Sequence, residues 1–341
     1  MRSPSHSTSR TWRGRATNVH FVLPADVDDP ASPSGGNVYD LRVGAGLNRL
    51  TVAGDWPRPR DTTALEQTLA GIPDGDVVLV DGLVGCGLPE VVVPHARRLK
   101  LAVLVHLPLA DETGLDPATA ALLDEKERQV LRAASAVIAT SPTAAHNLRA
   151  RHGLGTVHVV VPGTDPAPVA RGADGVSQLL CVASITPRKG HDLLVRALQK
   201  IDHEFRLVCV GPHRPFLETL PHDDRVSFPG PLTGEALTSA YAKSDLFVLA
   251  SRAETWGMVV TEALARGLPV IASAVPDALG DGGLLLPAGD QDALEAALTR
   301  WFHDPEFRRE LRAKALTRRA SLSTWDESTE DLRRVLVSLR P

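Results

Sequence analysis

The sequence is short of several residue types, and each shortage limits what the chain can be. Only 3 cysteines and 2 methionines occur among 341 residues, and aromatic side chains make up 4%. The cysteines, Cys86, Cys181 and Cys209, have no metal-binding spacing, and the last two lie in apolar runs typical of strands. We therefore expect reduced thiols in the core of a cytoplasmic protein, not a disulfide framework.

Long apolar runs and an excess of one charge are also missing. No stretch of about 18 consecutive apolar residues occurs, so the sequence predicts no membrane-spanning helix. The formal net charge is −4, and the arginines are scattered rather than gathered in a stripe. Neither nucleic acid nor an anionic membrane is therefore an expected partner. No Asp-x-Asp pair stands in a convincing loop, so we expect neither a metal ion nor a cofactor.

Length and apolar content are sufficient for two domains. Hydrophobic residues make up 43% of the 341 residues, which allows two separate cores. Residues 1–17 are rich in Ser and Arg and hold no acidic residue and no apolar run, so we expect a flexible tail. A targeting peptide has a similar composition, but the amphipathic stripe of such a peptide is missing here.

Short apolar runs alternate with helical patterns, which is typical of α/β proteins with doubly wound parallel sheets. In the first half, strands are predicted at 18–24, 50–53, 77–81, 101–106, 136–140 and 157–163. A Pro-, Gly- and Ala-rich stretch follows, and a second series of strands begins at Leu179. The expected organisation is a tail at 1–17, a domain at 18–163, a linker at 164–177, a domain at 178–323 and a final helix at 324–341.

The stretch Ser251–Pro269 is the most informative part of the sequence. It follows a predicted buried strand and continues as a loop and then a helix. Gly257 lies where the loop becomes the helix, so free N–H groups of the first turn can bind a phosphate. Glu254 in the loop and Glu262 in the helix can each accept hydrogen bonds from sugar hydroxyls. Alternatively, Glu254 only complements the helix dipole and Glu262 lies on a solvated face.

Two further groups lie where predicted strands end. Gly35 and Gly36 allow the backbone to approach a ligand, and Asn37 is expected to cap a helix that runs to about Asn48. Such a turn is typical of phosphate binding, although a glycine pair alone is also typical of a flexible turn. His106 ends the fourth predicted strand, where a histidine is either a ligand-contacting residue or a structural one.

The second domain opens with a strand that leads into two cations. Arg188 and Lys189 follow the segment S-I-T-P, and a helix is expected to start near Gly190. Both cations stand at the carboxyl edge of the strand, where they can neutralise a pyrophosphate, Arg188 with its planar fork and Lys189 as a point charge. The alternative is that they are charges of a solvated loop.

The segment E-T-W-G-M-V-V-T-E-A-L-A-R-G-L-P, at 254–269, resembles the E-x7-E signature of the retaining glycosyltransferases of family 4, which have the GT-B fold. Trp256 stands where that family usually has Phe, and Arg188 is adjacent to Lys189 rather than four residues before it. The resemblance implies that Glu254 holds a hydroxyl of the donor sugar and Glu262 the nucleotide ribose. The implied catalytic residues are His106, Glu254, Lys189 and Arg188. The implied donor-binding residues are Gly35, Gly36, Asn37, Thr255, Trp256, Gly257, Met258 and Glu262.

The same resemblance implies a fold and an activity. It predicts two Rossmann-like domains with a cleft between them and a last helix that crosses back to the first domain, with Trp325 as an anchor. The implied reaction is metal-independent, retaining transfer of a sugar from a nucleoside-diphosphate sugar to an acceptor hydroxyl or amine. Two alternatives stay open at this point: a catalytically silent module that binds a nucleotide sugar, and a nucleotide-sugar epimerase of similar shape.

Overall fold

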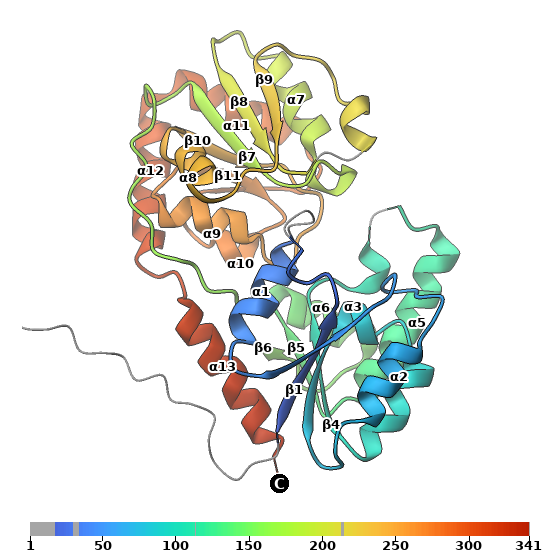
Figure 1. Ribbon diagram of the computed structural model, residues 1–341. Helices are drawn as coiled ribbons and strands as arrows, with labels where there is room; N and C mark the ends of the chain where they lie inside the picture. The colour runs from blue at the N-terminus through green and yellow to red at the C-terminus, as the bar shows by residue number, and fades with distance from the viewer. Residues whose placement is uncertain (1–17, 30–33, 113, 213–214, 341) are drawn as a thin grey trace, which may run out of the picture.

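The structure is a computed structural model that describes residues 18–29, 34–112, 114–212 and 215–340. The expected tail at 1–17 lies outside the described residues. The chain forms two lobes, one above the other in Figure 1, and each lobe is built on a six-stranded parallel sheet. The predicted α/β architecture with two doubly wound sheets is therefore confirmed.

The first sheet has the strand order β2-β1-β3-β4-β5-β6. β3 and β5 are buried along their whole length, because helices cover both faces of the sheet, and this is why they stand out in the sequence as unbroken apolar runs. The strands are β1 (Val19–Pro24), β2 (Asn48–Val52), β3 (Val77–Asp81), β4 (Lys100–Val105), β5 (Ala136–Ala139) and β6 (His158–Val159). The helices are α1 (Gly35–Val43), α2 (Thr63–Ala70), α3 (Gly82–Gly85), α4 (Pro89–Val92), α5 (Pro117–Ala133) and α6 (Pro142–His152), with 3₁₀ turns η1 (Val93–Arg97) and η2 (Leu109–Asp111).

The second sheet has the strand order β12-β11-β10-β7-β8-β9. Its strands are β7 (Gln178–Val182), β8 (Arg206–Val210), β9 (Val226–Gly230), β10 (Leu246–Leu249), β11 (Val270–Ser273) and β12 (Leu284–Leu286). Its helices are α7 (His191–Gln199), α8 (Gly234–Ala242), α9 (Met258–Ala265), α10 (Pro276–Leu279), α11 (Gln291–His303) and α12 (Pro305–Arg319), with 3₁₀ turns η3 (Pro187–Lys189) and η4 (Pro215–Thr219). One large apolar core surrounds this sheet, separate from the two cores that flank the first sheet.

Each sheet changes its winding direction beside its first strand. In the first sheet the change lies between β1 and β3, and in the second sheet between β7 and β10. Ligands of such sheets bind beyond the carboxyl ends of the strands at this point. The carboxyl edge of the first sheet faces the second lobe: the Thr143 N–H, after β5, donates to Asp277 on α10 at 2.9 Å. The two candidate binding edges therefore meet where the lobes join.

The final helix, α13 (Trp325–Ser338), returns to the first lobe and runs beside α1 (Figure 1). Leu332 and Leu336 are 1% and 0% exposed and belong to the same apolar core as Tyr39 of α1. The Trp325 ring lies 6.2 Å from the Tyr39 ring, and the Arg42 guanidinium lies 5.1 Å over Trp325. These contacts make α13 part of the core of the first lobe.

The helix after β1 differs from the expected one at both ends. Ser34, not Asn37, occupies the N-cap position, so the glycine pair belongs to the first helical turn. The helix ends at Val43 and not near Asn48, because Gly44 begins a glycine-rich segment that does not favour continued helix. The predicted glycine turn is therefore a helix start, and the backbone N–H groups of that turn lie at the edge that faces the second lobe.

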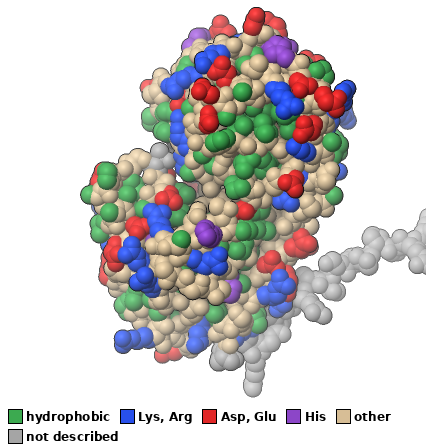
Figure 2. Space-filling view, turned by 180° about the vertical axis from the view of Figure 1, so that it is seen from behind, with side chains coloured by type: hydrophobic (Ala, Val, Ile, Leu, Met, Phe, Trp, Pro, Cys, Tyr) green, Lys and Arg blue, Asp and Glu red, His purple; other side chains and the backbone are tan. Residues whose placement is uncertain are grey.

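The surface and the cysteines agree with the composition. Figure 2 shows side chains of both charges interspersed over the face it presents, without a stripe of one sign. The three cysteines are buried and unpaired, as expected for core thiols. Among the helices of the described residues, none combines the length and the apolar character needed to cross a bilayer.

Candidate active site

The loop between β10 and α9 places Glu254 at the switch point of the second sheet. Gly257, the N-cap residue of α9, has a φ of 92°, and a Cβ at this position would lie 2.6 Å from Val275 Cγ1. Only glycine fits this turn without strain. The Glu254 side chain is 7% exposed and accepts a hydrogen bond from the Ser251 hydroxyl at 2.8 Å. The carboxylate is therefore held in place before any ligand binds.

Both predicted cations contact Glu254. Lys189 Nζ forms an ion pair with Oε1 of Glu254, and Arg188 Nη1 lies 3.6 Å from Oε2. The Lys189 and Arg188 side chains are 15% and 22% exposed, so neither belongs to a freely solvated loop. The fold thus brings together three of the four residues predicted for catalysis, although 65 positions separate Lys189 from Glu254.

The loops that carry these residues are fixed against each other. Gly190 has a φ of 67°, and a Cβ there would lie 1.9 Å from the carbonyl oxygen of Ala250. Arg252 donates its backbone N–H to the Arg188 carbonyl at 2.7 Å, and its guanidinium holds both carboxylate oxygens of Asp192 at 2.8 Å. The spacing between the cations and Glu254 is therefore set by backbone and bidentate contacts.

Glu262 lies in a partly buried position on α9, and not on a solvated face. Its Oε2 accepts a hydrogen bond from the Tyr241 hydroxyl at 2.9 Å. The Arg266 guanidinium lies 4.4 Å over the Tyr241 ring. Burial raises the pKa of Glu262 above its ordinary value, and the Tyr241 hydrogen bond opposes that rise. The alternative that Glu262 is an ordinary surface carboxylate is therefore wrong.

The first lobe contributes His106 and the start of α1. A Cβ built on Gly36 would lie 3.4 Å from the His106 ring, and one built on Gly35 would lie 3.7 Å from Met258 Sδ in the second lobe. Asn37, in the same turn, is half-buried. His106, the glycine pair and Met258 are therefore neighbours where the two sheet edges meet.

Two buried carboxylates lie behind His106, and the sequence analysis missed both. Asp40 Oδ1 accepts a hydrogen bond from His106 Nε2 at 2.8 Å, and the His106 side chain is 21% exposed. Asp81, which ends β3, lies beside them. Burial alone would lower the pKa of His106, but the neighbouring carboxylates outweigh burial and raise it to about 9. Burial, and then the charge of Asp40, raise the pKa of Asp81 to about 7.

A comparison with protein-family models finds one match in this part of the chain. Residues 176–304, which carry Lys189, Glu254 and Glu262, match the model described as glycosyl transferases group 1. The chain belongs to this family of glycosyltransferases. The matched residues make up most of the second lobe and include the cluster of Lys189, Arg188 and Glu254 at the switch point of its sheet.

Related glycosyltransferases agree with this assignment. The D-inositol 3-phosphate glycosyltransferase of Salinispora tropica is 32% identical over 248 residues, which are 60% of this chain and 51% of that protein. The chain spans between 31% and 66% of the length of the curated relatives compared. Sucrose-phosphate synthase from Thermosynechococcus elongatus has a TM-score of 0.76 at 22% identity, over 95% of this chain and 99% of that one. An Anabaena protein, HepE, crystallised with UDP and glucose, has a TM-score of 0.72 at 15% identity, over 95% and 100%. These likenesses establish the GT-B fold.

The predicted donor-binding residues around the family motif differ in their surroundings. Trp256 is 9% exposed and packs in the core of the second lobe, where its Nε1 is buried without a hydrogen-bond partner among the described residues. Thr255 is half-buried in the loop. Met258 packs against the cores of both lobes. Of these three, Met258 therefore lies at the junction of the lobes, and Trp256 mainly supports the loop.

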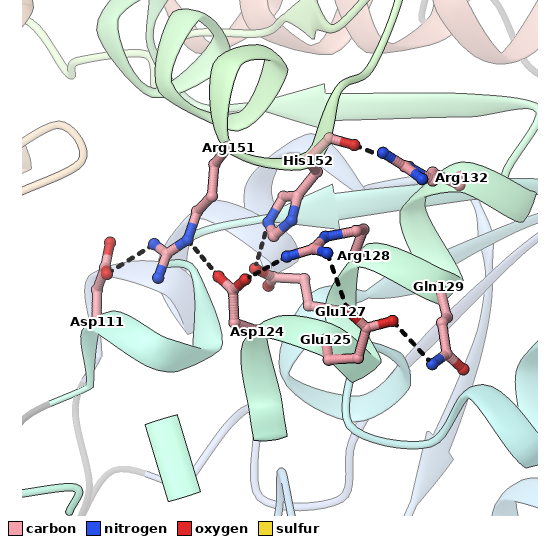
Figure 3. A network of polar contacts seen from close by, with 9 residues as sticks. All are labelled: Asp111, Asp124, Glu125, Glu127, Arg128, Gln129, Arg132, Arg151 and His152. Carbon is pink, nitrogen blue, oxygen red and sulfur yellow. Dashed lines mark hydrogen bonds and ion pairs between the residues drawn. The ribbon is translucent and has the colours of Figure 1, made fainter. Parts of the chain in front are cut away.

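The segment after His106 is fastened by a network of charged side chains (Figure 3). Glu127 of α5 accepts the Leu109 N–H of η2 at 3.2 Å, and its other oxygen pairs with His152 Nε2 at 3.0 Å. Both partners of this pair are wholly buried. Arg151 joins the network by bonding Asp111 of η2 at 2.8 Å. The position of the chain after β4 therefore depends on α5 and α6.

Two groups of side chains in the described residues are close enough together to hold a metal ion. One is Cys181, His191 and Cys209, which lie within the core of the second lobe. The other is Asp40, Asp81 and His106. In the second group His106 Nε2 donates a hydrogen bond to Asp40 Oδ1 at 2.8 Å.

Proposed function

We propose that this protein is a retaining glycosyltransferase that moves a sugar from a nucleoside-diphosphate sugar to an acceptor hydroxyl or amine. The observation that carries the proposal is the contact of Glu254 with Lys189 and Arg188 at the switch point of the second sheet. A pyrophosphate leaving group needs positive charge beside it, and a sugar needs a fixed hydrogen-bond acceptor; this cluster offers both.

The residues divide the work according to their chemistry. Lys189 and Arg188 stabilise the negative charge that develops on the departing diphosphate. Glu254, fixed by Ser251, orients a hydroxyl of the donor sugar, and Glu262 accepts a hydrogen bond from the ribose. His106 and the N–H groups at Gly35 and Gly36 approach the donor from the first lobe. The acceptor then attacks from the side on which the leaving group departs, and the diphosphate takes its proton.

We further propose that the transfer needs no metal, because the two cations supply the charge that a divalent ion would supply in other transferases. Three buried, unpaired thiols favour a reducing compartment, so we place the activity in the cytoplasm. Transfer in the presence of excess chelator tests the first point. A chelator-sensitive rate that Mg²⁺ or Mn²⁺ restores would contradict it.

Nucleotide binding and transfer should be tested separately. Thermal melting of the full chain with UDP, GDP and ADP, each alone, should show stabilisation by one of them, about 2.7 kcal/mol at 100 times its Kd. The corresponding sugar nucleotides should then release the nucleoside diphosphate faster when an acceptor is added. NMR of the product should show that the transferred sugar keeps the anomeric configuration of the donor. Binding without turnover would identify a silent module, turnover to an isomer without an acceptor an epimerase, and no stabilisation at all would overturn the proposal.

A further inference from the structure

The acid pair behind His106 has no role in the reaction outlined above. Asp40 and Asp81 are 1% and 3% exposed, although carboxylates are rarely buried without full hydrogen bonding. Asp40 gives one oxygen to His106, and its other oxygen, Oδ2, is buried without a hydrogen-bond donor in the described part of the chain. Asp81 uses Oδ1 to accept the Leu83 N–H at 2.9 Å. A proton between the two acids would satisfy the remaining oxygen of Asp40.

The three groups are close enough to share protons. Ligand atoms of Asp40, Asp81 and His106 all lie within 4.8 Å of one another. They come from α1, from the end of β3 and from the end of β4, so three separate elements meet at this point. All three elements meet at the carboxyl edge of the first sheet. The trio of Asp40, Asp81 and His106 therefore lies directly behind the face that meets the second lobe.

We propose that Asp40 and Asp81 hold a proton between them and keep His106 as a cation, so that His106 presents an N–H group, and not a lone pair, to the ligand between the lobes. Asp40 and Asp81 are then positioning residues that act through His106. The identity of the ligand as a sugar nucleotide rests on the proposed function; the proton arrangement itself rests only on the geometry.

Charge balance favours this arrangement. Two ionised carboxylates beside one imidazolium would leave a net negative charge in a buried site, whereas one shared proton makes the trio neutral. The pKa values of Asp81 and His106 are both raised, which agrees with a proton on each of these two groups. Tyr39 and Cys86 are the other titratable groups packed here, and burial raises the pKa of each well above its ordinary value, so both stay neutral. Glu127, which acts on Cys86 from α5, is paired with His152.

The arrangement decides what His106 can recognise. Its Nε2–H is committed to Asp40, so Nδ1 is the nitrogen left for a ligand. As a cation, His106 donates a hydrogen bond to an oxygen of the donor sugar, such as a hydroxyl, and cannot act as the base that takes the acceptor's proton. The chemical partner of this ring is therefore an oxygen lone pair of the donor.

The proton arrangement can be tested without substrate. Protein labelled with ¹³C at the histidine Cε1 is titrated by NMR, and the His106 signal is assigned by its absence in His106→Gln. We expect a His106 pKa of about 9 in the unaltered protein. In Asp40→Asn it should fall, because the charge and the hydrogen bond of Asp40 are lost and only Asp81 still opposes the effect of burial. In Asp81→Asn, whose amide can still donate to Asp40, it should fall by less.

A matched control comes from a second histidine–acid pair in the same lobe. His20 Nε2 bonds Asp76 at 3.0 Å, and Asp76 lies before β3, at the opposite end of that strand from Asp81. Asp76→Asn should leave the His106 titration unaltered. An ordinary His106 pKa in the unaltered protein, or one insensitive to Asp40→Asn, overturns the proposal. Broadening of the His106 signal by equimolar Mn²⁺ would assign the trio to a metal and also overturn it.

Kinetics supply a readout that a purely structural role would not give. Asp40→Asn should lower kcat at least about tenfold while the Kd for the nucleoside diphosphate stays unchanged, and Asp76→Asn should change neither. If Asp40→Asn does not fold, Asp81→Asn carries the test, with a lower kcat at pH values above 7. Unaltered kcat in a folded Asp40→Asn protein overturns the positioning role. A protein that transfers no sugar but shows the expected His106 titration would overturn only the proposed function.

Discussion

The two sheet edges that meet at the junction of the lobes are built in opposite ways. The edge of the second sheet presents two partly exposed cations, Lys189 and Arg188, beside the nearly buried carboxylate of Glu254, on loops fixed against each other. The edge of the first sheet buries its charges, Asp40 and Asp81, and exposes only part of one histidine. We therefore expect the edge of the second sheet to contact the ligand through its charged side chains. The edge of the first sheet contacts it through the His106 ring, whose charge depends on the two buried acids.

The lobes also differ in what holds them together. The core of the second lobe is closed by its own helices, whereas one core of the first lobe includes Leu332 and Leu336 from the C-terminal helix. A site at the junction therefore depends on a helix that is last in the sequence and far from the motif. The predictions below separate these contributions.

The largest expected effect is on the stability of the first lobe. Leu336→Ala should destabilise it by about 2–5 kcal/mol, because a wholly buried leucine of α13 is lost from the core beside Tyr39. Hydrogen exchange should become faster in β1 and α1 and stay unchanged in β7 and β10. The control is Leu316→Ala, at a leucine that is 42% exposed on α12. Equal acceleration in both lobes would show that α13 does not belong to the first lobe alone.

The next effect is on the charged edge. Lys189→Ala should lower turnover about a hundredfold, since removing one cation from a developing diphosphate costs about 3 kcal/mol. Lys200→Ala is the control, because Lys200 also pairs with a glutamate, Glu295, at 2.6 Å but on the outer surface of the lobe. The rate of nucleoside-diphosphate release measures the turnover of both variants. Similar rates for the two would mean that Lys189 is a structural partner of Glu254 only.

What the sequence predicted differs between the two edges for a physical reason. Lys189 and Glu254 lie in short segments where a buried strand leads into a helix, and Glu262, inside α9, was predicted from the E-x7-E signature. Asp40 was missed because it lies inside a helix, where one acid looks like a solvated residue, and its partner His106 is 66 positions away. Asp81 carried a signal that could have been used: it ends an apolar strand at the same edge as His106.

The fold was largely predictable from the sequence, and the predictions that were wrong concern the ends of single elements. Buried parallel strands show as apolar runs, so both sheets were anticipated with small shifts at their ends. The start and the end of α1 were wrong because Ser34 caps the helix in place of Asn37 and glycines end it early. Packing of α13 on α1 brings together segments far apart in the sequence, so no local pattern encodes that pairing, and only the family resemblance predicted it.

A smaller effect is expected at the inner glutamate of the second edge. Glu262→Gln keeps the shape and can still accept from the Tyr241 hydroxyl, but it loses the charge that strengthens a bond to a ribose hydroxyl. Affinity for the nucleoside diphosphate should fall by about 1.5 kcal/mol, roughly tenfold, by calorimetry. Glu254→Gln should instead reduce turnover more than affinity. Unchanged nucleotide binding in Glu262→Gln would remove the ribose role.

The smallest effect is expected for the charged network that holds the segment after His106 in place (Figure 3). Arg151 joins Asp111 of η2 to Asp124 of α5, and its side chain is 32% exposed, so the bridges contribute at most about 1 kcal/mol. Arg151→Ala should therefore lower turnover only roughly twofold to fivefold, by loosening the chain that follows His106, and high salt should reduce the difference. Arg128→Ala is the matched control, because Arg128 pairs with Asp124 and Glu125 within α5 and does not reach η2. If both variants lose the same turnover, the network acts through α5 and not through the segment after His106.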